Sequence, residues 1–232
     1  LASGGAAFEQ SGGTLTVLGS LSSNAPFLKT AGTLSGHFTN LAAGHFTFSG
    51  GVIDSIGEVE GNADGTFTNA GAFTWLGGTL RENFINTASE DQPFVLTGIS
   101  PKTISAAGTP LAISLTNQGR IEHRDTGSLL LGGSVDATNE AMGVYLLTGG
   151  GQISRVATDD EGFFVNQGEI RKAGASTTAG IHVPFIQVVP GASIVVDSGT
   201  LLLTHNGTNI SAGSFAAAAG ALIEIHKGRV LN

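Results

Sequence analysis

Short runs of alternating apolar and polar residues recur along the whole chain. Thr14-Leu15-Thr16-Val17 and His45-Phe46-Thr47-Phe48 are two examples, rich in β-branched or aromatic residues and closely followed by glycine. A period of two is the pattern of a half-buried β-strand. Turn signals such as Gly50-Gly51 and Asn206-Gly207 separate the runs. The pattern predicts an all-β protein with little α-helix.

One phrase returns in the same frame: an apolar residue, a spacer, an amide, a short gap and a glycine. Its clearest copies are Phe67-Thr68-Asn69-Ala70-Gly71, Leu115-Thr116-Asn117-Gln118-Gly119 and Phe164-Val165-Asn166-Gln167-Gly168. Looser copies are Phe8-Glu9-Gln10, Phe38-Thr39-Asn40 and Phe185-Ile186-Gln187, while Phe215 to Ile225 keeps the apolar frame without the amide. A second phrase, glycine, threonine or serine and then leucine, begins at Gly13, Gly32, Gly78, Gly127 and Gly199.

The spacing of the first phrase indicates stacked coils. Its anchors are Phe38, Phe67, Leu115, Phe164, Phe185 and Phe215, and the two intervals that meet at Leu115 are much longer than the others. Coils of roughly 20–30 residues fit these intervals if each long gap holds two coils. We therefore predict that residues 1–232 form a single right-handed parallel β-helix (β-solenoid) with about 8–11 irregular coils. A β-sandwich also has short strands at close spacing, but it does not require one phrase throughout the chain.

The recurrent amide predicts a ladder. In stacked coils, asparagines at the same corner lie about 4.8 Å apart, and such a side-chain amide ladder can satisfy backbone groups at a turn where strand pairing stops. Phe67, Phe164 and Phe185 are then expected in the core, and Trp75 shares the inward face of Phe73. The glycine after each amide is expected to supply a positive φ at the corner.

These phrases resemble the repeats of large bacterial extracellular proteins with parallel β-helix regions, the adhesin-like and autotransporter-like surface proteins. The resemblance spans roughly residues 8–225. It implies export and an extracellular or cell-surface location, and it supplies no catalytic positions.

Composition and charge narrow the function. Glycine is 36 of 232 residues, about twice its usual share, which disfavours helix-rich folds. The net charge of −8 without a basic cluster argues against nucleic-acid binding. The absence of cysteine excludes disulfides and thiolate metal sites. No apolar stretch approaches the ~18 residues of a membrane span. Because the sequence starts at Leu1 without methionine, we expect a processed or trimmed product, in keeping with secretion.

Few residues suggest chemistry. Arg120, Glu122 and Arg124 share one face of an expected strand and are the best candidates for a catalytic groove, with surface ion pairing as the alternative. The acidic turn Asp159–Gly162 has the oxygen ligands of a calcium site, with a solvated turn as the alternative. Glu58, Glu60 and Asp64 alternate along one further segment. His37 and His45 each precede an inward phenylalanine and are expected to face solvent. We predict no catalytic, cofactor-binding or metal-binding residue.

These observations favour a non-enzymatic structural or adhesive rod, a segment of a longer or self-assembling extracellular protein. The alternatives are a carbohydrate-active β-helix enzyme, either a polysaccharide lyase or a glycosidase, and a carbohydrate-binding module. Polysaccharides and a cell surface are the candidate partners for contact. Because the coil ends of a solenoid leave backbone groups unpaired, self-association through those ends is expected too.

Overall fold

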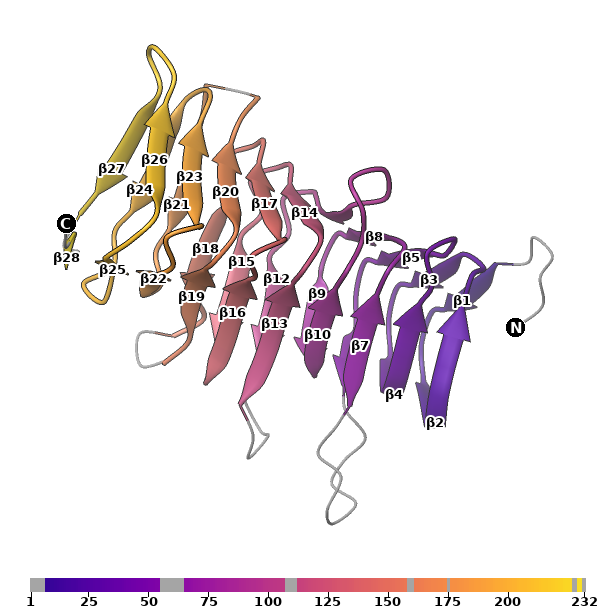
Figure 1. Ribbon diagram of the computed structural model, residues 1–232. Coiled ribbons are helices and arrows are strands. Elements are labelled where there is room, and N and C mark those ends of the chain that lie inside the picture. Colours follow the sequence, from indigo (N-terminus) through magenta and orange to yellow (C-terminus); the bar gives the residue numbers. More distant parts are fainter. Residues whose placement is uncertain are drawn as a thin grey trace.

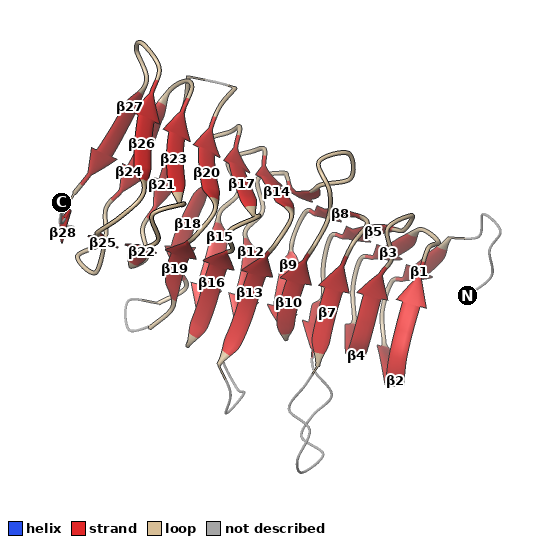
Figure 2. Ribbon diagram, viewed as in Figure 1, coloured by secondary structure: helices blue, strands red, loops and turns tan. Residues whose placement is uncertain are grey.

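The chain winds into a parallel β-solenoid, a stack of successive coils. The computed structural model describes residues 7–54, 65–106, 112–157, 161–174, 176–226 and 229–230. Within these residues every strand pair is parallel and no helix occurs, as Figures 1 and 2 show. Each coil contributes strands to three faces, which we call faces 1, 2 and 3 in the order in which the chain visits them.

Face 1 is a sheet of ten strands in the described residues. Its members are β1 (Phe8–Gln10), β3 (Phe27–Lys29), β5 (His45–Phe48), β8 (Ala72–Trp75), β11 (Phe94–Leu96), β14 (Arg120–His123), β17 (Val144–Leu147), β20 (Glu169–Lys172), β23 (Ser193–Val196) and β26 (Ser214–Ala217). Neighbours in the sheet are successive visits of the chain to this face, so each pair is one coil apart.

Faces 2 and 3 are two ladders joined through the long strands β2 (Thr14–Ser23) and β4 (Thr33–Asn40). Face 2 continues with β6 (Val52–Asp54), β9 (Gly78–Arg81), β12 (Lys102–Ser105), β15 (Leu129–Gly132), β18 (Gln152–Arg155), β21 (Thr178–Ile181), β24 (Thr200–Leu203) and β27 (Leu222–Ile225). Face 3 continues with β7 (Thr66–Asn69), β10 (Asn83–Asn86), β13 (Ile113–Asn117), β16 (Val135–Asn139), β19 (Phe163–Asn166), β22 (Phe185–Gln187), β25 (Asn209–Ile210) and β28 (Arg229–Val230).

Coil length varies while the register of inward residues is kept. Asn69 and Asn86 occupy the same position in successive coils, and so do Asn86 and Asn117, although the second step along the chain is nearly twice the first. The two long gaps of the repeated phrase each hold an extra coil, marked by Phe84-Ile85-Asn86 and Ala137-Thr138-Asn139 on face 3. The predicted stack of irregular coils is therefore confirmed.

The core is a set of side-chain columns parallel to the solenoid axis. On face 1 the rings of Phe27, Phe46 and Phe73 stack with centroids 4.8 and 4.9 Å apart. On face 3 Phe67 stacks on Phe84 at 5.1 Å and meets Phe46 edge to face. This spacing is the inter-strand distance, so the register itself stacks the rings.

The predicted core positions are confirmed. Phe67, Phe164 and Phe185 are each at most 1% exposed, and Trp75 shares the buried face of Phe73. From β14 onward the face 1 column is mostly aliphatic, with Ile121, Ile170 and Ile194 in the positions of the earlier phenylalanines and Tyr145 between the first two.

Two assignments made from the repeated phrase are wrong. Phe8 and Phe215 belong to face 1, in the column of Phe27 and Ile194, and not to the asparagine-bearing face 3. Both faces use an apolar residue followed by a spacer and a further inward residue, so the two frames look alike where the asparagine is missing.

The predicted asparagine ladder runs along the corner between faces 3 and 1. Six consecutive side-chain bonds, each 2.7–2.9 Å long, connect Asn40, Asn69, Asn86, Asn117, Asn139, Asn166 and Gln187. In every step the Nδ2 of one coil donates to the side-chain oxygen of the next. Most of these amides also donate to a backbone carbonyl beyond the corner, as Asn117 does to Val144 at 3.2 Å.

The glycines after the ladder amides serve close packing and not a positive φ. The backbones of Gly71, Gly119 and Gly168 do not have a positive φ, but a Cβ at each would collide with carbonyl oxygens of the coil before it. The positive φ occurs instead at the corner between faces 1 and 2, at Gly13 and Gly32 of the second phrase. The predicted role of the first set is therefore wrong, because the close approach of successive coils, and not the turn, excludes a side chain there.

Candidate functional site

The structure brings Arg120, Glu122 and Arg124 together on the outer surface of face 1. The Nε of Arg120 lies 2.8 Å from one carboxylate oxygen of Glu122, and Nη2 of Arg124 lies 2.7 Å from the other. Arg120 also reaches Glu90 at 3.0 Å. The arginines lower the pKa of Glu122 against the opposing effect of its partial burial.

This arrangement is a chain of surface ion pairs. Both oxygens of Glu122 accept hydrogen bonds from guanidinium groups, so neither is free to transfer a proton to a substrate. A similar cluster lies two strands further along face 1, where Arg171 contacts Asp197 at 2.6 Å and Glu169 at 3.5 Å. Two such clusters at different levels of one face indicate that ion pairing is how this surface accommodates charge.

The other acidic candidates lie largely outside the described residues. Glu58, Glu60 and Asp64 fall in the segment 55–64, and Asp159 and Asp160 fall in 158–160. Of that acidic turn, Glu161 is exposed and Gly162 is buried. Among the residues that the structure places, no group of three or more histidines or carboxylates could hold a metal ion.

One histidine departs from the expected surface position. His45 is exposed and His37 partly so, but His123 is only 1% exposed. Its Nε2 lies 2.6 Å from the carbonyl of Gly127, which can only accept, so Nε2 carries the proton and Nδ1 accepts from the Tyr145 hydroxyl at 3.2 Å. Burial lowers the pKa of His123 to about 4, so the ring is neutral at physiological pH.

His123 belongs to a set of buried hydrogen-bond donors at the corner between faces 1 and 2. Lys29, Lys102 and Lys172 have no exposed surface. The Nζ of Lys29 donates to the carbonyls of Ala31 and Gly32 at 2.9 and 2.8 Å, and Nζ of Lys102 donates to Ser100 at 2.7 Å. We call Gln10, Lys29, Trp75, Lys102, His123 and Lys172 the corner donors.

The corner donors bond to backbone carbonyls of the turn from face 1 to face 2, some of which also accept a backbone bond from the next coil, as Gly32 does from Val52. In the coil that contains β8, the donor is Trp75, whose Nε1 donates to the carbonyl of Gly77 at 3.1 Å. Burial lowers the pKa of Lys29 to about 8 and also lowers the pKa of Lys102 and Lys172. The donors thus perform at this corner the structural work that the asparagine ladder performs at the other.

Sequence reasoning missed the corner donors, although a signal was present. Phe27-Leu28-Lys29, Ile121-Glu122-His123 and Ile170-Arg171-Lys172 occupy the same three positions as Phe73-Thr74-Trp75. An alignment of these face 1 segments would have placed Lys29, Lys172 and His123 inward.

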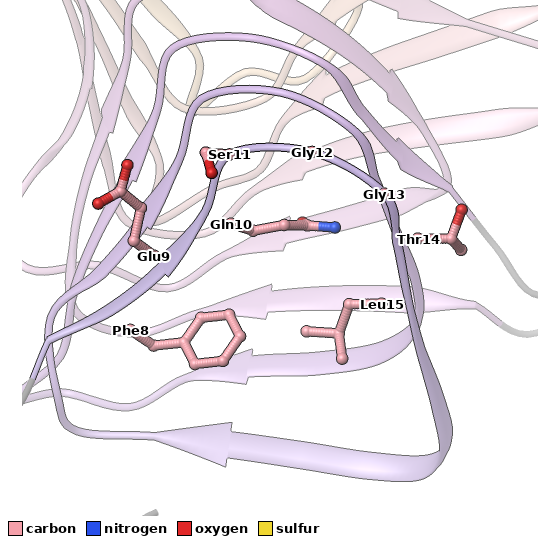
Figure 3. A pocket seen from close by; sticks show the side chains of 8 residues that line it. All are labelled: Phe8, Glu9, Gln10, Ser11, Gly12, Gly13, Thr14 and Leu15. Carbon is pink, nitrogen blue, oxygen red and sulfur yellow. The ribbon is translucent and has the colours of Figure 1, made fainter.

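A hollow of about 460 Å³ opens at the first coil, lined by residues from Phe8 to Leu15 (Figure 3). Gln10 extends across it, only 5% exposed, and its Nε2 donates to the carbonyl of Thr33 at 2.7 Å. Its Oε1 has no hydrogen-bond partner among the described residues. Phe8 and Leu15 supply its apolar surface, while Glu9, Gln10, Ser11 and Thr14 supply polar groups, so the hollow is the end of the core bordered by a polar rim.

Comparison with protein-family models, curated proteins and solved structures finds no match to this chain. Within the described ranges no helix is long and apolar enough to cross a membrane.

Proposed function

We propose that this chain is a non-enzymatic structural or adhesive segment of an extracellular surface protein, and that it forms a rod which can associate through its ends. The ladder from Asn40 to Gln187 carries the proposal. Its buried amides are fully committed to holding one coil on the next, and the corner donors do the same at a second corner. Because these bonds hold each coil on the next, the interior favours a stiff and elongated solenoid.

The outer surface supports the same proposal. The best candidate for a catalytic carboxylate, Glu122, has both oxygens bonded to arginines. The outer surface of face 1 thereby offers paired charges to polysaccharide or a cell surface, which suits weak multivalent contact along a rod more than attack on a glycosidic bond.

A polysaccharide panel tests the proposal against its enzymatic alternative. We would incubate the chain with acidic and neutral polysaccharides, with and without calcium, and measure unsaturated and reducing ends. The proposal expects none from the unaltered chain and none from Glu122→Gln. Product that the unaltered chain releases would overturn the proposal, and its loss in Glu122→Gln would assign catalysis to this surface.

The rod and its location have tests of their own. Limited proteolysis should leave residues 65–106 and 112–157 resistant when cleavage is mapped by mass spectrometry, because their strands pair on both sides. Antibodies against the chain should label intact cells that produce it. Rapid cleavage within β13 or β16, or labelling only after permeabilisation, would contradict the structural role or the extracellular location respectively.

A further inference from the structure

At each end of the described solenoid, the face 1 strand has a paired neighbour on one side only. In the described chain β1 pairs only with β3, and β26 pairs only with β23 (Figure 1). Phe215 is 41% exposed, whereas the same face 1 column is at most 2% exposed from Phe27 to Ile194. Such edges bind further strands.

The first and last coils place an aromatic residue at the same inward position of face 1. Pairing along face 1 places Phe8, then Phe27, and finally Phe215 in a single column. Gly13 and Gly220 each follow the aromatic of that column at the same interval and have φ of 63° and 80°. The first and last coils therefore both place a glycine of positive φ at the corner from face 1 to face 2, although the last coil has one residue more before face 2 begins.

The backbone hydrogen bonds of this corner have the same direction along the axis at both ends of the solenoid. The amide of Thr33 donates to the carbonyl of Gly13, and the amide of Leu222 donates to that of Gly199, in each case from a later coil to an earlier one. The amide of Thr14 is equivalent to that of Thr33, and the carbonyl of Ala221, directly before Leu222, is equivalent to that of Gly199. At this corner of the described chain the first coil therefore presents a backbone amide without a partner coil, and the last coil presents a backbone carbonyl without one.

We propose that a second copy of this chain stacks its first coil on the last coil of its neighbour, head to tail, with β1 beside β26. Phe8 then meets Phe215, and Glu9 lies beside Ala216. This specifies the contact for the end-to-end association in the proposed function and rests on it. The exposed ring of Phe215 meets Phe8, one of the two apolar residues of the hollow, and continues the column, as Phe27 does on Phe8 at a centroid distance of 4.7 Å.

A copy of the chain fits this surface better than an unlike partner. It supplies a parallel strand, an aromatic in the same column and a corner glycine at the same interval, all in the matching order. The small uncharged Ala216 opposes no charge to Glu9. A contact between unlike ends does not close on itself, so stacking continues into a filament.

Cysteine trapping tests the register, because the chain has no cysteine of its own. Glu9→Cys and Ala216→Cys are mixed and oxidised mildly. Adjacent strands hold paired Cα atoms about 4.8 Å apart, within the range of a disulfide. We expect mixed dimers with the 9–216 linkage, and a ladder of covalent multimers from the double variant. Thr74→Cys, outward in a central strand, replaces Glu9→Cys in the matched control and should give at least tenfold less.

A second variant tests whether the packing of the Phe215 ring is needed for the 9–216 disulfide to form. Phe215→Asp should lower the yield of the 9–216 disulfide at least tenfold while the far-UV spectrum stays unchanged, and Val188→Asp, exposed and away from both ends, should not. Linkages 9–9 or 216–216, or an absence of cross-linked product at high concentration, would overturn the proposal. Products in the polysaccharide assay would overturn the proposed function and leave this result intact.

Discussion

The Nδ2 of Asn117 donates to the Oδ1 of Asn139 at 2.7 Å, and neither side chain is more than 1% exposed. The two residues are 22 positions apart in the sequence and one coil apart in space. Each also bonds to the coil on its other side, so the pair lies in the middle of a continuous chain of amides.

Asn117→Ala should destabilise the protein strongly. The change leaves Asn86 without its acceptor and Asn139 without its donor, both in the interior. A buried group without a partner costs about 1–3 kcal/mol, so we expect a loss of about 3 kcal/mol. Denaturant unfolding measures it. Thr116→Ala, on the outward neighbour, is the control and should change stability by less than about 0.5 kcal/mol. Equal effects of the two changes would show that the ladder contributes little.

Gly32→Ala should also destabilise. Gly32 has φ of 72°, and a Cβ there would collide with the carbonyl of Gly13. The left-handed conformation alone costs about 1–2 kcal/mol for alanine, and we expect about 2 kcal/mol or more in total. Gly191→Ala is matched, since its Cβ would meet nothing within 4 Å. The comparison of melting temperatures checks this, and a Gly32→Ala protein as stable as Gly191→Ala would contradict the corner geometry.

Lys29 should make stability rise with pH in the alkaline range. Its pKa is lowered to about 8 in the folded protein from an ordinary value of 10.5, so between these values the unfolded chain binds more protons. Stability contributed by this group therefore increases across that interval, by at most about 1.4 kcal/mol per pH unit. In Lys29→Met the increase should be smaller by this amount when unfolding is measured across the same range. Parallel pH curves for the two proteins would refute the burial of the charge.

Glu82 should have the opposite dependence. It lies between β9 and β10, 2% exposed, and its carboxylate has no hydrogen-bond partner among the described residues. Burial, with a smaller contribution from Asp54, raises its pKa well above the ordinary value. The folded protein therefore holds a proton that the unfolded chain releases, and stability falls as pH rises through the interval between the two pKa values.

Glu82→Gln removes this loss. We expect the variant to be more stable than the unaltered protein at pH 8, by about 1 kcal/mol or more, and similar to it at pH 4. Glu90→Gln, at an exposed carboxylate, serves as control. A gain at pH 4 equal to the gain at pH 8 would mean that Glu82 is charged in the fold.

The solenoid can be predicted because stacking repeats its demands in every coil. Asn69, Asn117 and Asn166 stand in one frame since each must reach the next amide, and that requirement is visible in the sequence. The face to which a phrase belongs is not visible where the amide is missing, so the phrase alone assigns Phe8 and Phe215 to the wrong face. Only the pairing with Phe27 and Ile194 decides it.

The buried lysines are harder to predict, because lysine is rarely found without exposed surface. What keeps Lys29 inside is the pair of carbonyls of Ala31 and Gly32, which the turn aims at its Nζ. These are backbone groups, whose direction the residue type does not reveal. The pairing of Glu122 with Arg120 and Arg124 is easier to predict, since alternation along one strand places all three on one side.

The direction of the inter-coil hydrogen bonds, parallel to the solenoid axis, also determines how the protein would respond to tension. Under a force applied at the chain ends, the end coil, whose face 1 strand is paired on one side only in the described chain, would detach first, so coils would detach one after another instead of yielding together. Each detached coil of about 20–30 residues would release roughly 65–100 Å of extended chain. A rod of this kind would lengthen stepwise under load and absorb work at every step, while its remaining coils stayed intact.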